Sequence, residues 1–337
     1  MDHSAERVTL ARLPSGVEIE TTVHTYDGDD DGPTVYVQAA QHGREINGTE
    51  TLRRVHDRLL GSASADAEET GDDSSGGFDL AGRLVAVPVA DPLTFDRVSY
   101  TTPEELDSVN PNMNRVWPGD ADGTVHERMA ATLWKYVEDA DAVVDLHTGS
   151  ADMLTHVVFM EGHDESRALA EAFGTDLLLS EEAGEDADAE WADRDFDGKL
   201  RVAASHEGIP TITPELAHNK QLVADAVEAG VEGTLAVLRH LDLLPGDPDA
   251  SGERRLARNH LGRVTADDAG LFRLDPDREV GQRVEPGERV GTLYDPTTYE
   301  VLQEAETDRA GILYSLTREA TVSGGETLLS VALPRDE

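Results

Sequence analysis

The stretch PTVYVQAAQHGREINGTETLRRVHDRLL, residues 33–60, decides the fold class. Its first nine residues are almost continuously apolar, which is typical of a strand buried on both faces of a sheet. Its last thirteen residues place leucine and valine at helical spacing. A buried strand that leads directly into a helix predicts an α/β unit. The apolar run stops at His42, and Glu45 follows three residues later in the connecting loop.

Strand and helix patterns continue to alternate up to about residue 243, which predicts an α/β domain over residues 1–245 with a mostly parallel or mixed sheet flanked by helices. An alternating stretch at 7–24, interrupted by Pro-Ser-Gly, predicts a hairpin at the edge of that sheet. Further buried strands are expected at RLVAVPVAD (83–91), DAVVDLHTG (141–149) and IPTITPELAHN (209–219), and amphipathic helices at HERMAATLWKYVEDA (126–140) and QLVADAVEAGVEGTLAVLRHLDLL (221–244).

The composition changes at PGDPDASGERR, residues 245–255, which has the character of a linker. Residues 252–337 contain short strand patterns separated by turns, and they predict a smaller all-β domain. The stretches VEPGERVGTL (284–293) and VSGGETLLSV (322–331) resemble each other and the barrel-sandwich of biotinyl-lipoyl domains. No lysine follows Lys220, so attachment of lipoate or biotin is excluded.

The chain has 69 acidic residues against 28 basic ones, a net charge of −41, and only three of the basic residues are lysine. This charge repels nucleic acid and anionic membranes, so we expect neither as a partner. The composition resembles that of proteins from halophilic archaea. The absence of cysteine leaves only His, Asp and Glu as strong metal ligands. No secretion signal or long apolar run is visible, which predicts a soluble cytoplasmic protein. The acidic segments 61–77 and 181–190 are expected to be loops.

Three predicted strands end in residues that can bind a cation or move a proton. The first provides His42 and Glu45, the next His147, and the last Glu215. Since ligands of an open α/β sheet lie at the carboxyl ends of its strands, we expect these side chains to converge. Two histidines and a glutamate form a common catalytic zinc site, and the remaining carboxylate is then available as a proton acceptor. The same residues taken singly are also compatible with structural hydrogen bonding, and Asp145 fits a supporting role better than that of a fourth ligand.

Four ordered motifs carry a family resemblance: QHGREINGTE (41–50), NPNMNRVWPG (110–119), VVDLHTG (143–149) and TITPEL (211–216). In this order and spacing they resemble the succinylglutamate desuccinylase/aspartoacylase family, within the zinc carboxypeptidase superfamily. The resemblance implies one Zn²⁺ per subunit held by His42, Glu45 and His147, with Glu215 as the proton-transferring carboxylate. It also implies that Asn114 and Arg115 bind a substrate carboxylate, for which a guanidinium group is well suited.

The sequence departs from the family pattern at two points. Asn112 stands where the family commonly has aspartate before its Asn-Arg pair, so a charge next to the site is missing. The upstream arginine that polarises the scissile carbonyl is assigned to Arg97, although Tyr100 is an alternative for that position. Two other histidines, His126 and His218, are expected on the surface or behind the ligands, and Tyr294 is a less favoured substrate contact.

These observations predict a zinc-dependent hydrolase that cleaves the amide bond of an N-acyl amino acid or a similar small N-acyl amine. Its substrate would carry a carboxylate, and a homo-oligomer is compatible with the sequence. Two alternatives are a carboxypeptidase-type metallopeptidase and a non-catalytic binding protein that keeps the fold.

Overall fold

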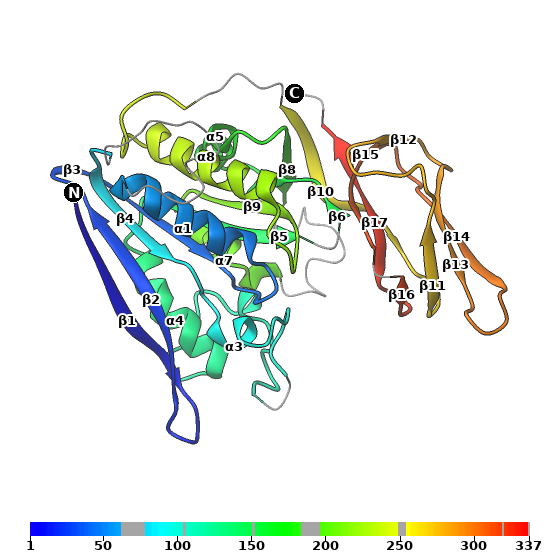
Figure 1. Ribbon diagram of the computed structural model, residues 1–337, viewed down its shortest axis with the longest axis horizontal. Coiled ribbons are helices and arrows are strands. Elements are labelled where there is room, and N and C mark those ends of the chain that lie inside the picture. Colours follow the sequence, from blue (N-terminus) through cyan, green and yellow to red (C-terminus); the bar gives the residue numbers. More distant parts are fainter. Residues whose placement is uncertain are drawn as a thin grey trace.

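A computed structural model describes residues 1–61, 78–103, 106–149, 152–182, 196–248, 254–318 and 320–335 (Figure 1). Most of the two acidic segments expected to be loops, residues 62–77 and 183–190, lies outside the described residues. Among the described residues, no helix is both long and apolar enough to cross a membrane.

A mixed sheet of 13 strands forms the centre of the protein and extends into its C-terminal part (Figure 1). Twelve strands follow the order β1-β2-β4-β3-β5-β9-β7-β8-β10-β17-β15-β12, and β6 pairs with β15. Five neighbouring pairs in the middle are parallel: β3 with β4 and β5, β5 with β9, and β8 with β7 and β10. The strands are β1 (Asp2–Arg12), β2 (Glu18–Asp27), β3 (Asp30–Ala39), β4 (Ala81–Val87), β5 (Ala142–Gly149), β6 (Asp152–Met153), β7 (His156–Met160), β8 (Leu177–Glu181), β9 (Thr211–His218), β10 (Arg255–Thr265), β12 (Arg283–Val284), β15 (Gly311–Leu316) and β17 (Thr327–Pro334).

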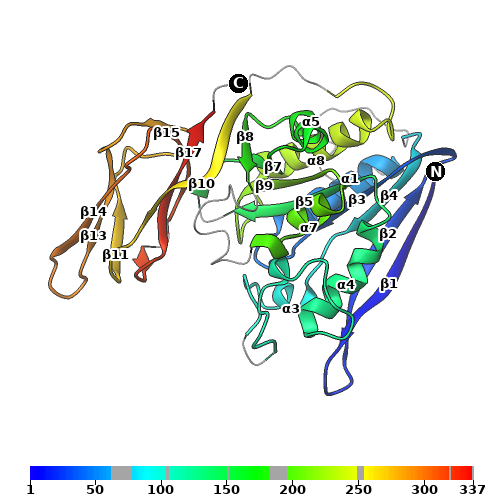
Figure 2. The same ribbon diagram turned by 180° about the vertical axis from the view of Figure 1, so that it is seen from behind.

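Helices cover both faces of this sheet, so its central strands are buried on two sides as their apolar composition predicts (Figures 1 and 2). One apolar core joins the sheet to α1 (Asn47–Leu60), α5 (Asp164–Phe173) and α8 (Ala224–His240). A second core on the opposite face includes α4 (Val125–Val137) and α7 (Leu200–His206). Short helical turns α3 (Pro92–Phe95), η1 (Met113–Arg115) and η3 (Phe196–Gly198) lie in the connections. The predicted α/β architecture is therefore confirmed, including the edge hairpin β1-β2.

The C-terminal part is antiparallel and contains a second, four-stranded sheet in the order β14-β13-β11-β16 (Figure 1). These strands are β11 (Gly270–Leu274), β13 (Arg289–Tyr294), β14 (Val301–Glu306) and β16 (Thr321–Val322). Apolar residues of both sheets meet in a core of their own around Phe272 and Leu293. The small β region is therefore present as expected. Its first strand, β10, pairs in parallel with β8, so hydrogen bonding continues across the predicted linker. The division into 1–245 and 252–337 stays a prediction.

Candidate active site

The turn after β3 brings His42 and Glu45 together. The Glu45 backbone N–H donates to the carbonyl of His42 at 2.9 Å, which closes a four-residue turn before α1 begins. The turn runs directly against the backbone at Thr94, where a Cβ on Gly43 would lie 2.0 Å from the carbonyl carbon. Glycine is thus required at position 43 because two segments of backbone touch there.

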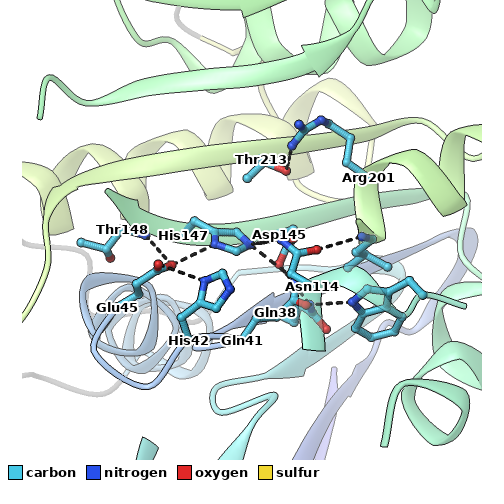
Figure 3. Close-up of polar contacts among 12 residues, drawn as sticks. Gln38, Gln41, His42, Glu45, Asn114, Asp145, His147, Thr148, Arg201 and Thr213 are labelled. Atoms are coloured by element: carbon cyan, nitrogen blue, oxygen red, sulfur yellow. Dashed lines mark hydrogen bonds and ion pairs between the residues drawn. The ribbon is translucent and has the colours of Figure 1, made fainter. Parts of the chain in front are cut away.

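His147 joins this pair from the neighbouring strand. Because β3 and β5 are parallel and adjacent, their carboxyl ends lie at the same edge of the sheet. The Nδ1 atoms of His42 and His147 lie 2.9 Å from Oε1 and Oε2 of Glu45, respectively (Figure 3). All three side chains are buried, and one ligand atom from each lies within 4.8 Å of the others. The predicted convergence of these three residues is therefore observed.

The hydrogen bonds behind the two imidazoles leave both Nδ1 atoms facing the carboxylate of Glu45. His147 Nε2 donates to Asp145 Oδ2 at 2.9 Å, and His42 Nε2 donates to Asn112 Oδ1 at 3.1 Å. With Nε2 protonated, a neutral ring directs the lone pair of Nδ1 toward the carboxylate of Glu45, which is repulsive unless a proton or metal ion lies between them. His42 Nδ1 is buried and, among the described residues, has no hydrogen-bond partner of acceptable geometry. The donor set and these supporting acceptors fit Zn²⁺.

Asp145 is held rigidly behind His147 rather than beside the ligands. Its carboxylate accepts from Gln38 Nε2 at 3.0 Å and from Gln41 Nε2 at 2.7 Å (Figure 3). Burial opposes ionisation of Asp145, but His147 and these hydrogen bonds outweigh it and lower the pKa. Burial likewise opposes protonation of His147, yet Asp145 and Glu45 raise the pKa of His147 well above its ordinary value. The site thus stabilises positive charge in the absence of metal.

Glu45 remains ionised for a related reason. Burial alone would raise the pKa of its carboxyl, but the adjacent imidazoles of His42 and His147 together lower that pKa below its ordinary value. The backbone N–H of Thr148 also donates to Glu45 Oε2 at 3.2 Å. Glu45 is therefore in the anionic form that a metal ligand needs.

Glu215 lies next to His42, Glu45 and His147, but its surroundings shift its pKa in the direction opposite to that of Glu45. It is the cross-strand partner of His147 between β5 and β9, and it is partly exposed to a cavity. Burial raises the pKa of Glu215 to about 7, with His147 opposing the shift and Glu45 adding to it. A carboxylate with a near-neutral pKa is suited to accept a proton and to return it. The two glutamates thus have pKa values shifted in opposite directions.

A cavity of about 390 Å³ opens above these residues. It is lined by five basic side chains, namely those of Arg44, Arg115, Lys199, Arg201 and Arg263. Arg201 is buried, donates to Thr213 Oγ1 at 2.7 Å and forms an ion pair with Glu181. Burial lowers the pKa of Arg201 to about 10, which leaves it charged at neutral pH. Lys199 also forms an ion pair with Glu181, and basic residues outnumber the carboxylates in the lining, which is compatible with an anionic ligand.

Asn114 and Arg115 lie in η1, at the wall of the cavity; their binding of a substrate carboxylate stays a prediction. The Oδ1 atom of Asn114 accepts from the backbone N–H of Leu200 at 3.0 Å and joins η1 to α7. The guanidinium group of Arg115 lies over the ring of Phe196, 5.1 Å from its centroid. Both side chains line the cavity, and Arg115 presents its charge there.

Tyr100 rather than Arg97 lines the cavity. The Tyr100 ring stacks on His42 with 4.0 Å between ring centroids, and the guanidinium of Arg44 lies 4.7 Å from the Tyr100 centroid. Arg97 is exposed on the loop after α3 and is not among the cavity-lining residues. Its role in polarising the carbonyl therefore stays a prediction that this arrangement does not favour.

Several residues discussed from the sequence lie outside the cavity. His126 was expected at the surface or behind the ligands, but it is fully buried beside Asp91, with Nε2 and Oδ2 3.3 Å apart. Tyr294 is also absent from the cavity lining; Tyr314 of β15 lies there instead. The sequence reasoning missed Tyr314 and Arg201. The only signal for Arg201 was a charged residue inside an otherwise apolar helix pattern.

With this geometry established, comparison with known proteins shows the family. The succinylglutamate desuccinylase/aspartoacylase catalytic domain matches residues 72–241, which is half of the chain. This chain belongs to that family. The matched region contains His147, Asn114, Arg115 and Glu215, whereas His42 and Glu45 precede it.

Individual relatives of the family extend over nearly the whole chain. N-alpha-acetyl-L-2,4-diaminobutyric acid deacetylase of Halomonas elongata is 28% identical over 320 residues, covering 90% of this chain and 82% of the relative. The crystal structure of succinylglutamate desuccinylase/aspartoacylase from Rhodobacter sphaeroides matches with a TM-score of 0.78 and 23% identity over 99% of this chain and 96% of that one. The product-bound structure of the ectoine utilization protein EutE (DoeB) from Ruegeria pomeroyi matches with a TM-score of 0.79 and 22% identity, over 98% of this chain and 95% of that one. The two structures show that the fold of the family includes the C-terminal β region.

Proposed function

We propose that this protein is a zinc-dependent deacylase that hydrolyses the amide bond of a small N-acyl amino acid. The observation that carries the proposal is the buried group His42, Glu45 and His147 at the floor of a basic cavity, with Glu215 beside it. Membership of a desuccinylase/aspartoacylase family and similarity to a deacetylase support the reaction class.

Each residue has a distinct role in this proposal. A zinc ion, when bound by His42, Glu45 and His147, supplies Lewis acidity for a carbonyl group and for water. Glu215 accepts a proton from the attacking water and delivers it to the departing amine, for which its pKa of about 7 is well placed. Asp145 keeps His147 in the tautomer that directs Nδ1 toward the metal position.

The substrate is proposed to carry at least one carboxylate. Five basic side chains line a cavity of about 390 Å³, which suits a small anionic molecule. Arg115 is the residue we assign to that carboxylate, through a paired hydrogen bond from its guanidinium group. Because the Halomonas elongata relative is a deacetylase of N-alpha-acetyl-L-2,4-diaminobutyric acid, an N-acetylated amino acid is the first substrate to test.

A panel of N-acetyl, N-succinyl and N-formyl amino acids, together with short peptides, separates this proposal from a carboxypeptidase. We expect hydrolysis of acyl amino acids, loss of activity after chelation, and recovery with Zn²⁺. Cleavage of peptides alone would establish the peptidase instead. Absence of hydrolysis in a folded, zinc-loaded protein would contradict both and would favour a binding function.

A further inference from the structure

A second group of histidines lies at the β1-β2 end of the sheet, on the N-terminal hairpin and on the helix that covers it. His3 of β1 is the direct cross-strand partner of Tyr26 on β2, and His24 lies two residues before Tyr26 on the same face. Helix α1 packs over this face and provides His56. Cross-strand neighbours and the covering helix therefore bring three imidazoles together from separate elements.

The distances among these imidazoles suit one shared ion. His3 Nε2 and His24 Nδ1 lie 3.1 Å apart, and one ring nitrogen from each of the three histidines lies within 4.8 Å of the others. Two nitrogens bound to one tetrahedral zinc at about 2.0–2.1 Å are roughly 3.3–3.4 Å apart. Small rotations of partly exposed rings are enough to reach that spacing.

Tyr26 orients the third imidazole. The Tyr26 hydroxyl lies 2.7 Å from Nδ1 of His56, and the Tyr26 ring is buried in the core below. When Nδ1 carries the proton and donates to this hydroxyl, the lone pair of Nε2 is available to a metal ion. Holding a ligating imidazole by its second nitrogen is the usual supporting contact in metal sites.

The local electrostatics keep the imidazoles of His3 and His24 in the neutral form that binds metal. Burial and the neighbouring histidines lower the pKa of His3 and of His24, so both are neutral at neutral pH. Neutral imidazole is the ligand form. The strongly negative chain also favours accumulation of cations near its surface.

We propose that His3, His24 and His56 form a second metal site, distinct from the group formed by His42, Glu45 and His147. Three imidazoles without thiolate or carboxylate select a late divalent transition metal such as Zn²⁺, with water completing the coordination. The ion would connect the edge strand β1 and its neighbour β2 to the helix α1. The site does not depend on the proposed deacylase activity.

Zinc binding to a His147→Gln variant of the full chain tests the site, since that substitution removes a ligand of the active-site group. After chelation, calorimetric titration with Zn²⁺ should still show about one equivalent bound. Adding His24→Gln or His56→Gln should abolish this binding, and adding Tyr26→Phe should weaken it about 10- to 100-fold. Adding His206→Gln, an exposed histidine at the end of α7, is the matched control and should leave it unchanged.

Circular dichroism of each variant verifies that it is folded, and two independent histidine substitutions keep the test decisive if one variant fails to fold. The proposal is overturned if the His147→Gln protein binds no zinc, or if its zinc binding survives both His24→Gln and His56→Gln. Deacylase activity is measured separately, on the protein that retains His147. Failure of the second metal site is therefore distinguishable from failure of the proposed deacylase function.

Discussion

Replacing Glu215 with glutamine should make the metal-free protein more stable while it makes the enzyme less active. The pKa of Glu215 is raised from 4.5 to about 7, chiefly by burial, so the folded protein prefers the neutral carboxyl. Glutamine is nearly isosteric and permanently neutral. The substitution therefore removes the cost of ionising this group inside the fold.

The size and sign of the effect follow from proton linkage. A carboxyl whose pKa is raised on folding contributes a stability that is complete below pH 4.5 and is lost as the pH rises to about 7. A shift from 4.5 to about 7, at about 1.4 kcal/mol per pH unit, gives about 3 to 4 kcal/mol. The glutamine variant should thus be more stable than wild type by about 3 to 4 kcal/mol at pH 8, and by less than about 1 kcal/mol at pH 5.

Urea denaturation of chelator-treated protein at the two pH values measures this difference. Glu207→Gln, at an exposed position after α7, is the matched control, and its difference in stability from wild type should be the same at the two pH values. In the zinc-loaded enzyme, Glu215→Gln should lower kcat about 10²- to 10⁴-fold without loss of bound metal. If Glu215→Gln differs from wild type in stability by the same amount at pH 5 and pH 8, or is less stable than wild type at pH 8, then Glu215 does not have a raised pKa in the folded protein.

Three further results are expected. Asp145→Asn should weaken zinc binding about 10- to 100-fold, measured by titration against a chelator, because His147 loses its charged acceptor; unchanged affinity would contradict this. Asn112→Asp should bind zinc more tightly than wild type, because it places a charge at His42 Nε2, and weaker binding would count against that contact. Arg115→Ala should raise KM for a carboxylate substrate at least about tenfold, whereas Arg97→Ala should change kcat/KM less than about twofold. A large loss of kcat/KM in the Arg97→Ala variant would support the prediction that Arg97 polarises the scissile carbonyl.

Much of the fold was predictable because the relevant patterns are local. The strands β3, β5 and β9 are short and mostly buried, and parallel strands place their carboxyl ends at one edge of the sheet. That rule predicts from the sequence that His42, Glu45, His147 and Glu215 converge at one edge of the sheet. The order of strands in the sheet and the parallel pairing of β8 with β10 depend on contacts between distant segments. They could not be deduced in the same way.

The sequence did not predict correctly which residues face the cavity where this depends on the direction of a side chain rather than on the order of strands. Tyr100 and Arg97 are three residues apart in an irregular loop, and no periodicity indicates which of them faces inward. The sequence gives no indication of the position of Arg201; α7 is short and largely buried, and its single arginine forms an ion pair with Glu181 and lines the cavity. In both cases, the three-dimensional path of the backbone determines which side chain faces the cavity.

The distribution of charge links the site to its proposed substrate. A net charge of −41 repels anions over the molecule as a whole, so an anionic ligand binds only where the local potential is reversed. The cavity provides such a reversal, because arginines converge there from the turn after β3, from η1, from α7 and from β10. The carboxylates of Glu45 and Glu215 line the same cavity, and Glu45 belongs to the buried group of His42, Glu45 and His147. In the function proposed above, the substrate carboxylate would therefore bind at the basic walls of the cavity, and its amide would lie toward the two histidines and Glu215.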